Sequence, residues 1–492
     1  MNTKTLKGIL LYSLIIILVV AVVFVLVVAI MFIFPNLKLF GYGMIIRNEK
    51  IANDNFVAIS DSSLPYNLAI NVDNFSLTVN GVDSNNISYV IQDSAFGASK
   101  VSNASVVGEK DTNYSAITLI EPVGIVSYKN CAITVNVPKN LTYNLSVKSS
   151  NANISINELK LNDLNVTTTN GNFYISQSET DELNLNSLFI TTSTGNFDFR
   201  SKYNTVNVSN GTQINSNKGN FFFNTLNSDV SINSKDIYFE ASYLYTKQNG
   251  FEANVKNIVL KITKLLDSNS SQNSILTSSA SIEIDEVKGT TSIKSSNGKI
   301  RFGKIHDNCI IDSLEGDVSI NEALKYIKVK TSNANINVNL FYGIGNFETT
   351  KSGNITCNSI SKNANDFTTI TTNSGNITFT TAIAPFKIKS VGNSSISVSL
   401  KDLYYASSDA DVKTYEIDAE NSILSVNITN MKHYMCMAKG EINSSSGDIR
   451  IAPSETPQLY PKTGTPSVPE SRLPILKVIG KEIFFATINV IA

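Results

Sequence analysis

The stretch TTNSGNITF, residues 371–379, contains the pattern that decides the fold. A glycine is followed by an asparagine, and then β-branched or aromatic residues alternate with polar ones. The same pattern, with Gly or Ala in the glycine position and most often Asn or Asp after it, recurs at SSNANISI (149–156), TTNGNFYI (168–175), TSTGNFDF (192–199), SNKGNFFF (216–223), SSASIEI (278–284), SSNGKIRF (295–302), LEGDVSI (314–320), TSNANINV (331–338), KSGNIT (351–356) and SSSGDIRI (444–451). Such self-similarity indicates a protein built from repeats.

The glycine or alanine of each pattern marks the length of the repeat. One series of markers consists of Ala152, Gly171, Gly195 and Gly219, at intervals of 19, 24 and 24. A second series consists of Ala280, Gly298, Gly316, Ala334, Gly353 and Gly375, at intervals of 18, 18, 18, 19 and 22. A period near 20 is typical of a solenoid or of repeated hairpins.

After each marker the sequence alternates between apolar and polar residues. Ile336 and Val338 point one way and Asn335 and Asn337 the other, which predicts strands with one buried face. Glycine accepts positive φ and asparagine tolerates the left-handed region, so each pattern closes a corner and begins a strand. The segment INEALKYIKVK, residues 320–330, could begin with a helical turn, and the repeat is irregular at 235–275 and 401–435.

Two architectures fit this pattern. In a β-solenoid each repeat is one coil, paired with its neighbour at about 4.8 Å; in a set of β-sandwiches each repeat would be a hairpin with turns every 8–12 residues. The variable spacing favours the solenoid, because loops can bulge from some corners. We therefore expect an all-β fold, an elongated β-solenoid with repeats of about 18–24 residues, preceded by one N-terminal transmembrane helix.

The N-terminal apolar segment, residues 9–34, contains no charged residue. A helix of this length spans roughly 39 Å, more than the ~30 Å hydrocarbon core of a bilayer. A cleaved signal peptide would have a shorter apolar region and a small-residue cleavage site, so we expect an uncleaved anchor. Lys4 and Lys7 precede the segment, whereas Lys38, Arg47 and Lys50 follow it. Basic residues therefore lie on both sides, and the positive-inside rule gives almost no preference for either orientation. We expect a cytoplasmic N-terminus, with the bulk of the chain extracellular or extracytoplasmic.

The chain divides by composition into six segments. Six of the eleven prolines lie between Pro453 and Pro474, which predicts a loop or linker there. The expected organisation is a cytoplasmic stub at 1–7, a transmembrane helix at 8–34, a juxtamembrane connector at 35–65, the solenoid at 66–452, the proline-rich linker at 453–474, and C-terminal strands that cap the solenoid at 475–492.

The charge composition excludes one class of partner. Charged residues make up 16% of the chain and the net charge is −1. Nucleic-acid binding needs clustered Lys and Arg, so we expect no nucleic-acid partner.

The four cysteines, Cys131, Cys309, Cys357 and Cys436, have no CxxC spacing, and neither a zinc nor a redox motif is present. Cys309 and Cys357 would lie at least two coils apart, near 10 Å, which exceeds the Cα separation of about 7 Å that a disulfide allows. We therefore expect free thiols.

The segment AITVNVPKNLTYNLSVKSSNANISI, residues 132–156, carries a family resemblance. A strand, a Val-Pro step and a second strand precede the corner, and with its later repetitions this resembles a bacterial adhesin family, a β-solenoid domain of poorly defined function in envelope proteins. The resemblance covers roughly 66–452 and departs from the family pattern at Ala152, Ala280 and Ala334. It implies a surface or envelope role, and it supplies no catalytic residues.

Candidate chemistry is sparse in this sequence. The only histidines are His306 and His433, so no Ser–His–Asp arrangement can be argued. KIHDNCIID, residues 304–312, places Lys304, His306, Asp307 and Asp312 together and is the best enzyme candidate, but charges at strand ends in water explain it better.

Other short motifs are also better explained as surface features. Ser408–Asp411 lacks the Gly and Glu of a calcium loop. YPKTG at 460–464 lacks the context of a sorting signal, and sequons such as those at Asn140, Asn376 and Asn427 arise by chance in this composition. We expect no catalytic, cofactor-binding or metal-binding residues, no cofactor, and no enzymatic activity.

Three functions are consistent with these observations. The first is a membrane-tethered structural or adhesive module, with a glycan, the cell wall or a protein as its partner. The second is an envelope sensor that acts through a membrane protein. The third is a glycan-cleaving solenoid enzyme, which the sparse acidic clusters disfavour. The sequence favours the first.

Overall fold

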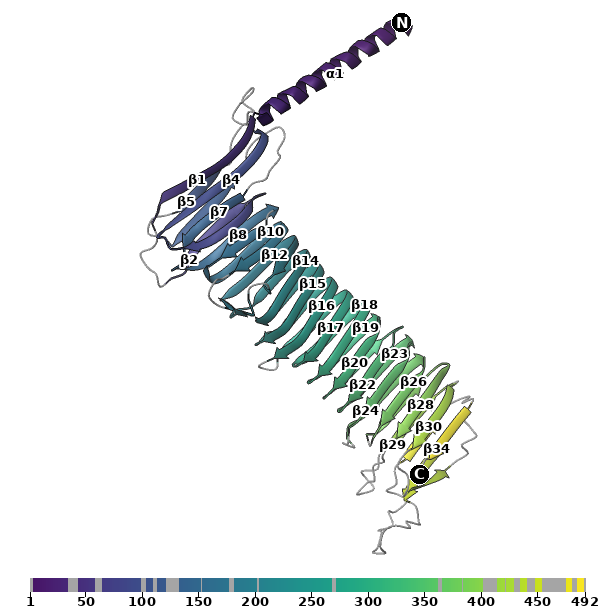
Figure 1. Cartoon of the computed structure of the whole chain (residues 1–492). Helices are drawn as coiled ribbons and strands as arrows, with labels where there is room; N and C mark the ends of the chain where they lie inside the picture. Colours follow the sequence, from purple (N-terminus) through teal and green to yellow (C-terminus); the bar gives the residue numbers. More distant parts are fainter. Residues whose placement is uncertain are drawn as a thin grey trace. The chain divides into compact units, whose positions relative to one another are not determined.

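The computed structural model describes most of the chain (Figure 1). The described residues are 3–33, 43–57, 64–98, 103–108, 113–120, 132–151, 153–176, 181–200, 203–267, 271–361, 365–382, 384–400, 414–420, 422–428, 434–439, 447–453, 475–479 and 485–490. They form two compact units, Met1–Tyr203 and Asn204–Ala492. The fold is an all-β solenoid with one N-terminal apolar helix, which confirms the fold class expected from the sequence.

The first unit contains the helix and the strands up to β12. The elements are α1 (Thr3–Ile33), β1 (Gly43–Val57), β2 (Tyr66–Val72), β3 (Ser76–Val82), β4 (Asn86–Ala98), β5 (Asn103–Gly108), β6 (Tyr114–Ile120), β7 (Ala132–Pro138), β8 (Thr142–Asn151), β9 (Ile154–Asn157), β10 (Lys160–Ser176), β11 (Glu182–Leu185) and β12 (Ser187–Asp198). Within α1, the 23 residues Gly8–Ile30 have a mean hydropathy of 3.6 and none is buried, so this helix is long and apolar enough to cross a membrane.

The coils of the first unit are not stacked in chain order. Strands β2 and β3 form a coil that pairs in parallel with β8 and β9, so that Tyr66 lies beside Tyr143, which comes much later in the chain. On its other edge the same coil pairs in parallel with β6 and β7. Strands β1, β4 and β5 then add antiparallel pairings to this group. The first coil is therefore enclosed between two coils that come later in the sequence.

The second unit contains the remaining strands. They are β13 (Thr205–Val208), β14 (Thr212–Asn227), β15 (Val230–Thr246), β16 (Phe251–Asp267), β17 (Gln272–Val287), β18 (Thr290–Ile305), β19 (Cys309–Glu315), β20 (Val318–Ala323), β21 (Ile327–Thr331), β22 (Ile336–Phe341), β23 (Gly345–Ser352), β24 (Ile355–Ser359), β25 (Thr368–Ser374), β26 (Ile377–Thr381), β27 (Phe386–Ser390), β28 (Ser394–Leu400), β29 (Thr414–Ala419), β30 (Ser422–Ile428), β31 (Tyr434–Lys439), β32 (Gly447–Pro453), β33 (Ile475–Ile479) and β34 (Phe485–Val490).

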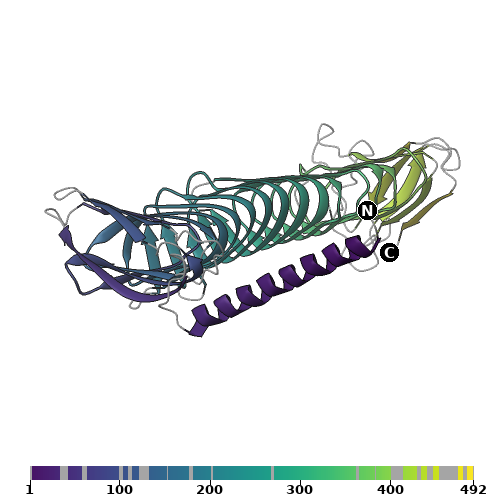
Figure 2. The ribbon, with the colours of Figure 1, turned by 90° about the horizontal axis from the view of Figure 1, so that it is seen from above.

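Parallel pairing between equivalent residues runs through the second unit. Strands β14 to β18 each make one long coil, and from β19 onward two shorter strands make each coil (Figure 2). The pairing skips a residue at each bend: Ser216 pairs with Ser234 and Lys218 with Asp236, and Asn217 is left out. Strands β33 and β34 pair in parallel with β29 and β30, after the antiparallel strands β31 and β32.

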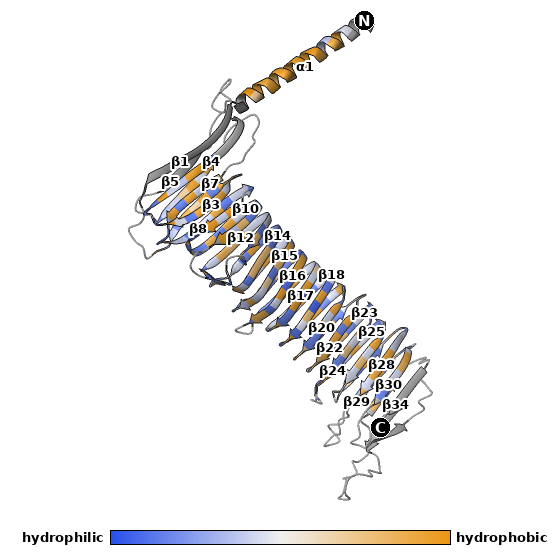
Figure 3. Cartoon of the chain, in the orientation of Figure 1, coloured by the Kyte–Doolittle hydropathy of each residue, from blue (hydrophilic) through white to orange (hydrophobic). Residues whose placement is uncertain are grey.

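The core is a set of aliphatic columns inside the coils. Buried and exposed residues alternate along the strands, and Figure 3 shows apolar and polar residues alternating along the same strands. One column, in which every side chain is at most 2% exposed, contains Ile282, Ile300, Val318, Ile336, Ile355, Ile377 and Ile396. Full burial of such a side chain contributes roughly 1.5–3 kcal/mol, so each added coil extends the core by a similar increment.

The corner pattern of the sequence has a specific hydrogen-bonding role. In several coils the Ser or Thr three residues before the marker points inward and caps the bend; for example, Ser295 Oγ donates to Asn297 O at 2.7 Å. Three residues at the equivalent position are buried and make no such bond: Thr192, Ser216 and Ser313. The side chain of the Asn after the marker accepts a backbone hydrogen bond from the next coil. Asn354 N donates to Asn335 Oδ1 at 3.0 Å, and Asn376 N donates to Asn354 Oδ1 at 2.9 Å. The stretch quoted first, which contains Asn376, is thus a structural corner.

The marker glycines allow the coils to approach each other closely. Gly298 has φ +117°, a conformation that side-chain-bearing residues rarely adopt. A Cβ on Gly316 would lie 1.6 Å from the carbonyl oxygen of Gly298 in the preceding coil. At Gly316 the glycine is therefore required by the close contact between two backbones.

Two local expectations were wrong. The described residues of the stretch 235–275 are regular and belong largely to β15 and β16. The stretch looked irregular because Ile237 and Ile258 occupy the marker position that Gly219 and Ala280 hold in neighbouring coils. The segment 320–330 contains no helical turn, because β20 continues to Ala323 and β21 begins at Ile327, and the inward side chains of both strands extend the core.

Several other sequence features lie outside the described residues. They are Ala152, Cys131, His433, the segment Ser408–Asp411, and the proline-rich segment apart from Pro453. Cys436 lies in β31.

The buried thiols give a direct test of the fold. Cys309 and Cys357 are free, fully buried and on different core columns, Cys309 beside Ile327 and Cys357 beside Phe379. Burial raises the pKa of the Cys309 thiol to about 12 and also raises that of Cys357, and only the thiolate reacts readily. We expect mass spectrometry to find neither residue alkylated in the native full-length protein and both alkylated in denaturant. Native alkylation of either would contradict this packing.

Candidate functional site

The enzyme candidate identified in the sequence is divided among separate ion pairs. Lys304 Nζ lies 3.0 Å from Glu322 Oε2. Asp307 pairs with Lys325 and accepts a hydrogen bond from Gly289 N at 3.0 Å. These partners come from different coils, so the two groups serve to join coils.

The other two residues of the candidate are also used separately. His306 Nε2 lies 2.9 Å from Glu286 Oε1. Asp312 lies on β19 in register with Lys294 and Lys330, on a different stretch of the coil from Lys304. The structure therefore does not bring the four predicted residues into one cluster.

The electrostatics of this region favour ionised carboxylates. The hydrogen bond from Lys264, at 3.2 Å, lowers the pKa of Glu286, against the opposing effect of burial, and His306 lowers it further. The bond from Lys325 likewise lowers the pKa of Asp307. A general acid at neutral pH needs the opposite shift, so these carboxylates are suited to ion pairing.

A column of alternating charge lies on the outer face of the long coils. We use the term column for equivalent outward side chains in successive coils. Glu240, Lys261, Glu283 and Arg301 are paired in register across β15, β16, β17 and β18. Arg301 Nη1 lies 3.6 Å from Glu283 Oε1. Such exposed pairs contribute little to stability individually, but they fix the order of charges on the face.

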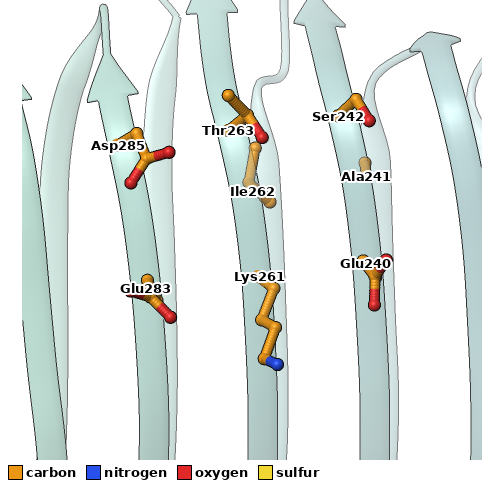
Figure 4. Close-up of a pocket in the computed structure, with 8 residues that line it drawn as sticks. All are labelled: Glu240, Ala241, Ser242, Lys261, Ile262, Thr263, Glu283 and Asp285. Atoms are coloured by element: carbon orange, nitrogen blue, oxygen red, sulfur yellow. The ribbon is translucent and has the colours of Figure 1, made fainter.

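A shallow groove of about 290 Å³ lies beside this column (Figure 4). Lys261 lies between Glu240 and Glu283 of the flanking strands, and the hydroxyl groups of Ser242 and Thr263 and the carboxylate of Asp285 lie further along the same strands. These groups can donate and accept hydrogen bonds with a polar ligand. Within the described part of the chain, no three His, Cys, Asp or Glu side chains are grouped as a metal site.

Exposed and half-buried aromatic side chains lie on β15, the strand that carries Glu240. Lys261 Nζ lies 5.8 Å from the centroid of the Tyr238 ring, a cation–π contact. Tyr243 and Tyr245 are about 40% exposed, and their rings are nearly parallel with centroids 6.2 Å apart. Exposed tyrosines beside paired charges form a mixed polar and aromatic surface of the kind that is enriched at binding sites.

The sequence analysis missed every residue of this groove. The column becomes visible only when coils of unequal length are aligned, since the interval from Glu240 to Lys261 is one shorter than the interval from Lys261 to Glu283. The alternation of charge sign at these intervals was the available signal.

The stacked coils, the single buried face of each strand and the apolar helix define a β-solenoid domain with one N-terminal apolar segment. The family model described as Toastrack DUF4097 matches residues 66–380, more than half of the chain, so the chain belongs to this family. No curated protein and no solved structure matches the chain. The family match agrees with the β-solenoid that the adhesin resemblance implied, but it does not address adhesion.

Proposed function

We propose that this protein is a membrane-anchored binding module without catalysis. In this proposal α1 crosses the bilayer with its N-terminus in the cytoplasm, and the solenoid lies outside, where it binds a glycan, cell-wall or protein partner. The exposed apolar segment Gly8–Ile30 supports the anchor.

One observation carries the binding role: outward side chains recur in register from coil to coil. The column from Glu240 to Arg301 is one example, and it offers a partner a carboxylate and a cation in turn at steps of about 4.8 Å. Such a surface suits a repetitive or extended partner. Lys304 and Asp307 of the enzyme candidate, in contrast, pair with Glu322 and Lys325 of the neighbouring coil.

Two experiments test this proposal. Protease added to intact cells is expected to degrade the solenoid and spare α1; complete protection in intact cells, with digestion after lysis, would contradict the orientation. Full-length protein in detergent micelles is expected to co-sediment with envelope material from its own cells. The binding role would be contradicted if the protein fails to sediment with envelope material and crosslinking in cells captures no partner protein.

A further inference from the structure

The outer face of the second unit changes its chemistry along one column. The column that carries Glu240, Lys261, Glu283 and Arg301 continues without interruption, because Arg301 pairs in register with Ser319. From that point its members in successive coils are uncharged: Ser319, Asn337, Thr356, Thr378, Ser397 and Ser425. The change from charged to neutral takes place between β18 and β20.

A parallel column on the same strands is also uncharged. It contains Asn358, Thr380, Ser399 and Asn427, each in register with the next. Both columns alternate with buried residues such as Phe379 and Val398, so their side chains point outward. We call the two columns together the neutral face.

Three side chains of the neutral face are not needed to hold the coils together. Within the described part of the chain, the side chains of Asn337, Thr356 and Thr378 are exposed and have no hydrogen-bond partner in the protein. The corner asparagines Asn335 and Asn354, in contrast, accept hydrogen bonds from the next coil. The amide group of Asn337 and the hydroxyl groups of Thr356 and Thr378 are therefore available to a ligand.

We propose that the neutral face is the docking surface for an uncharged polysaccharide, an inference that rests on the proposed binding function. Hydroxyl and amide groups both donate and accept hydrogen bonds, as do the hydroxyl and acetamido groups of neutral sugars. Successive coils present these groups at intervals of about 4.8 Å, which gives an extended chain repeated points of contact.

Other partner classes fit this face less well. An anionic polymer would find no cation in either column, although basic residues lie in the charged part of the same face. A protein interface needs apolar and aromatic residues at its centre, and the two columns contain none. An apolar partner would leave the hydroxyl and amide groups without hydrogen bonds, which is unfavourable for each group that is buried.

The test uses the full-length protein in detergent micelles and four polysaccharide probes. Insoluble chitin and cellulose are the neutral probes, polygalacturonate is the anionic probe and chitosan the cationic one. We expect co-sedimentation with at least one neutral probe. Thr378→Glu places a charge at the centre of the neutral face and is expected to weaken this binding by about tenfold, because the carboxylate must be desolvated on contact.

The matched control is Thr369→Glu. Thr369 lies on β25, one strand before Thr378, and also points outward, between Asn346 and Lys387 of the adjacent coils. It is expected to change binding less than twofold. Thr378→Val keeps the β-branched shape and removes only the hydroxyl group, so it is expected to weaken binding by about threefold and serves as the test if Thr378→Glu fails to fold.

Four results would overturn the inference: no binding to either neutral probe, stronger binding to a charged probe, equal loss in Thr378→Glu and Thr369→Glu, or undiminished binding by a folded Thr378 variant. If the neutral probes fail while envelope material still sediments with the protein, this inference falls and the proposed function stands. If envelope material also fails and crosslinking captures no partner, both fall.

Discussion

Replacing Gly316 with alanine is expected to lower the free energy of unfolding of the surrounding coils by about 3 kcal/mol or more. The added Cβ would lie 1.6 Å from the Gly298 carbonyl oxygen and 2.8 Å from its backbone nitrogen. These neighbours are backbone atoms and cannot rotate away, so the two coils must separate. Separation weakens the parallel pairing around Ile300 and Val318, on which the buried aliphatic column depends.

Hydrogen exchange of the full-length protein in detergent micelles measures this effect. A repeat array need not unfold in one step, so local exchange of the amides in β18 and β20 is more informative than a global midpoint. Glu315→Ala is the matched control, because Glu315 is exposed at the adjacent position and the change adds no atoms. Equal protection in Gly316→Ala and Glu315→Ala would contradict the close approach of these two coils.

Replacing Asp229 with asparagine is expected to cost about 2 kcal/mol. Its carboxylate accepts hydrogen bonds from four consecutive backbone amides of the next coil, with Lys247 N at 2.7 Å, Asn249 N at 3.1 Å, and Gln248 N and Gly250 N at 3.2 Å. The asparagine side chain keeps one acceptor oxygen and turns a donor toward the remaining amides. Those amides are then left without an acceptor.

The pH dependence of Asp229 follows from the same contacts. Burial acts to raise the pKa of Asp229, but the four backbone hydrogen bonds outweigh it and lower the pKa below the ordinary value of 3.8. The stabilisation is therefore present above pH 3.8 and is lost as the pH falls through the folded-state pKa.

The measurement for Asp229 is the exchange rate of the amides at 247–250. We expect Asp229→Asn to accelerate their exchange at neutral pH and the difference from wild type to shrink at low pH. Asp285→Asn removes the charge from an exposed carboxylate of the groove and is expected to change stability by less than about 0.5 kcal/mol. An equal effect of the two substitutions would show that the turn does not depend on this carboxylate.

Much of the solenoid could be predicted because its strands and corners are determined by residues that are close together in the sequence. Alternation at Ile336 and Val338 indicated one buried face, and both side chains are at most 1% exposed. The glycine-marked corners gave the period. The same reasoning failed where another residue took the marker position: Ile237 is accommodated at a bend without glycine, so a regular coil looked irregular.

The remaining features depend on contacts between distant residues. The pairing of Tyr66 with Tyr143 helps to enclose the first coil, and no local sequence pattern predicts this pairing. The candidate groove and the neutral face depend on register between coils of unequal length, so neighbours such as Lys261 and Glu283 are separated by a whole coil of sequence. Sequence proximity instead suggested His306 and Asp312. In the fold His306 pairs with Glu286, whereas Asp312 lies in register with Lys294 on another stretch of the coil.

The constant offset between central coils has an evolutionary consequence. Thr291 pairs with Cys309, and Cys309 with Ile327, and the two intervals are equal (309 − 291 = 327 − 309). If one repeat of this length were lost or duplicated, Thr291 would still pair with the equivalent residue of another coil. Every remaining column would stay continuous. The enclosed coil of the first unit has no such freedom, because its neighbours come from separate parts of the gene. Homologues are therefore expected to differ in length by whole coils gained or lost in the middle of the domain.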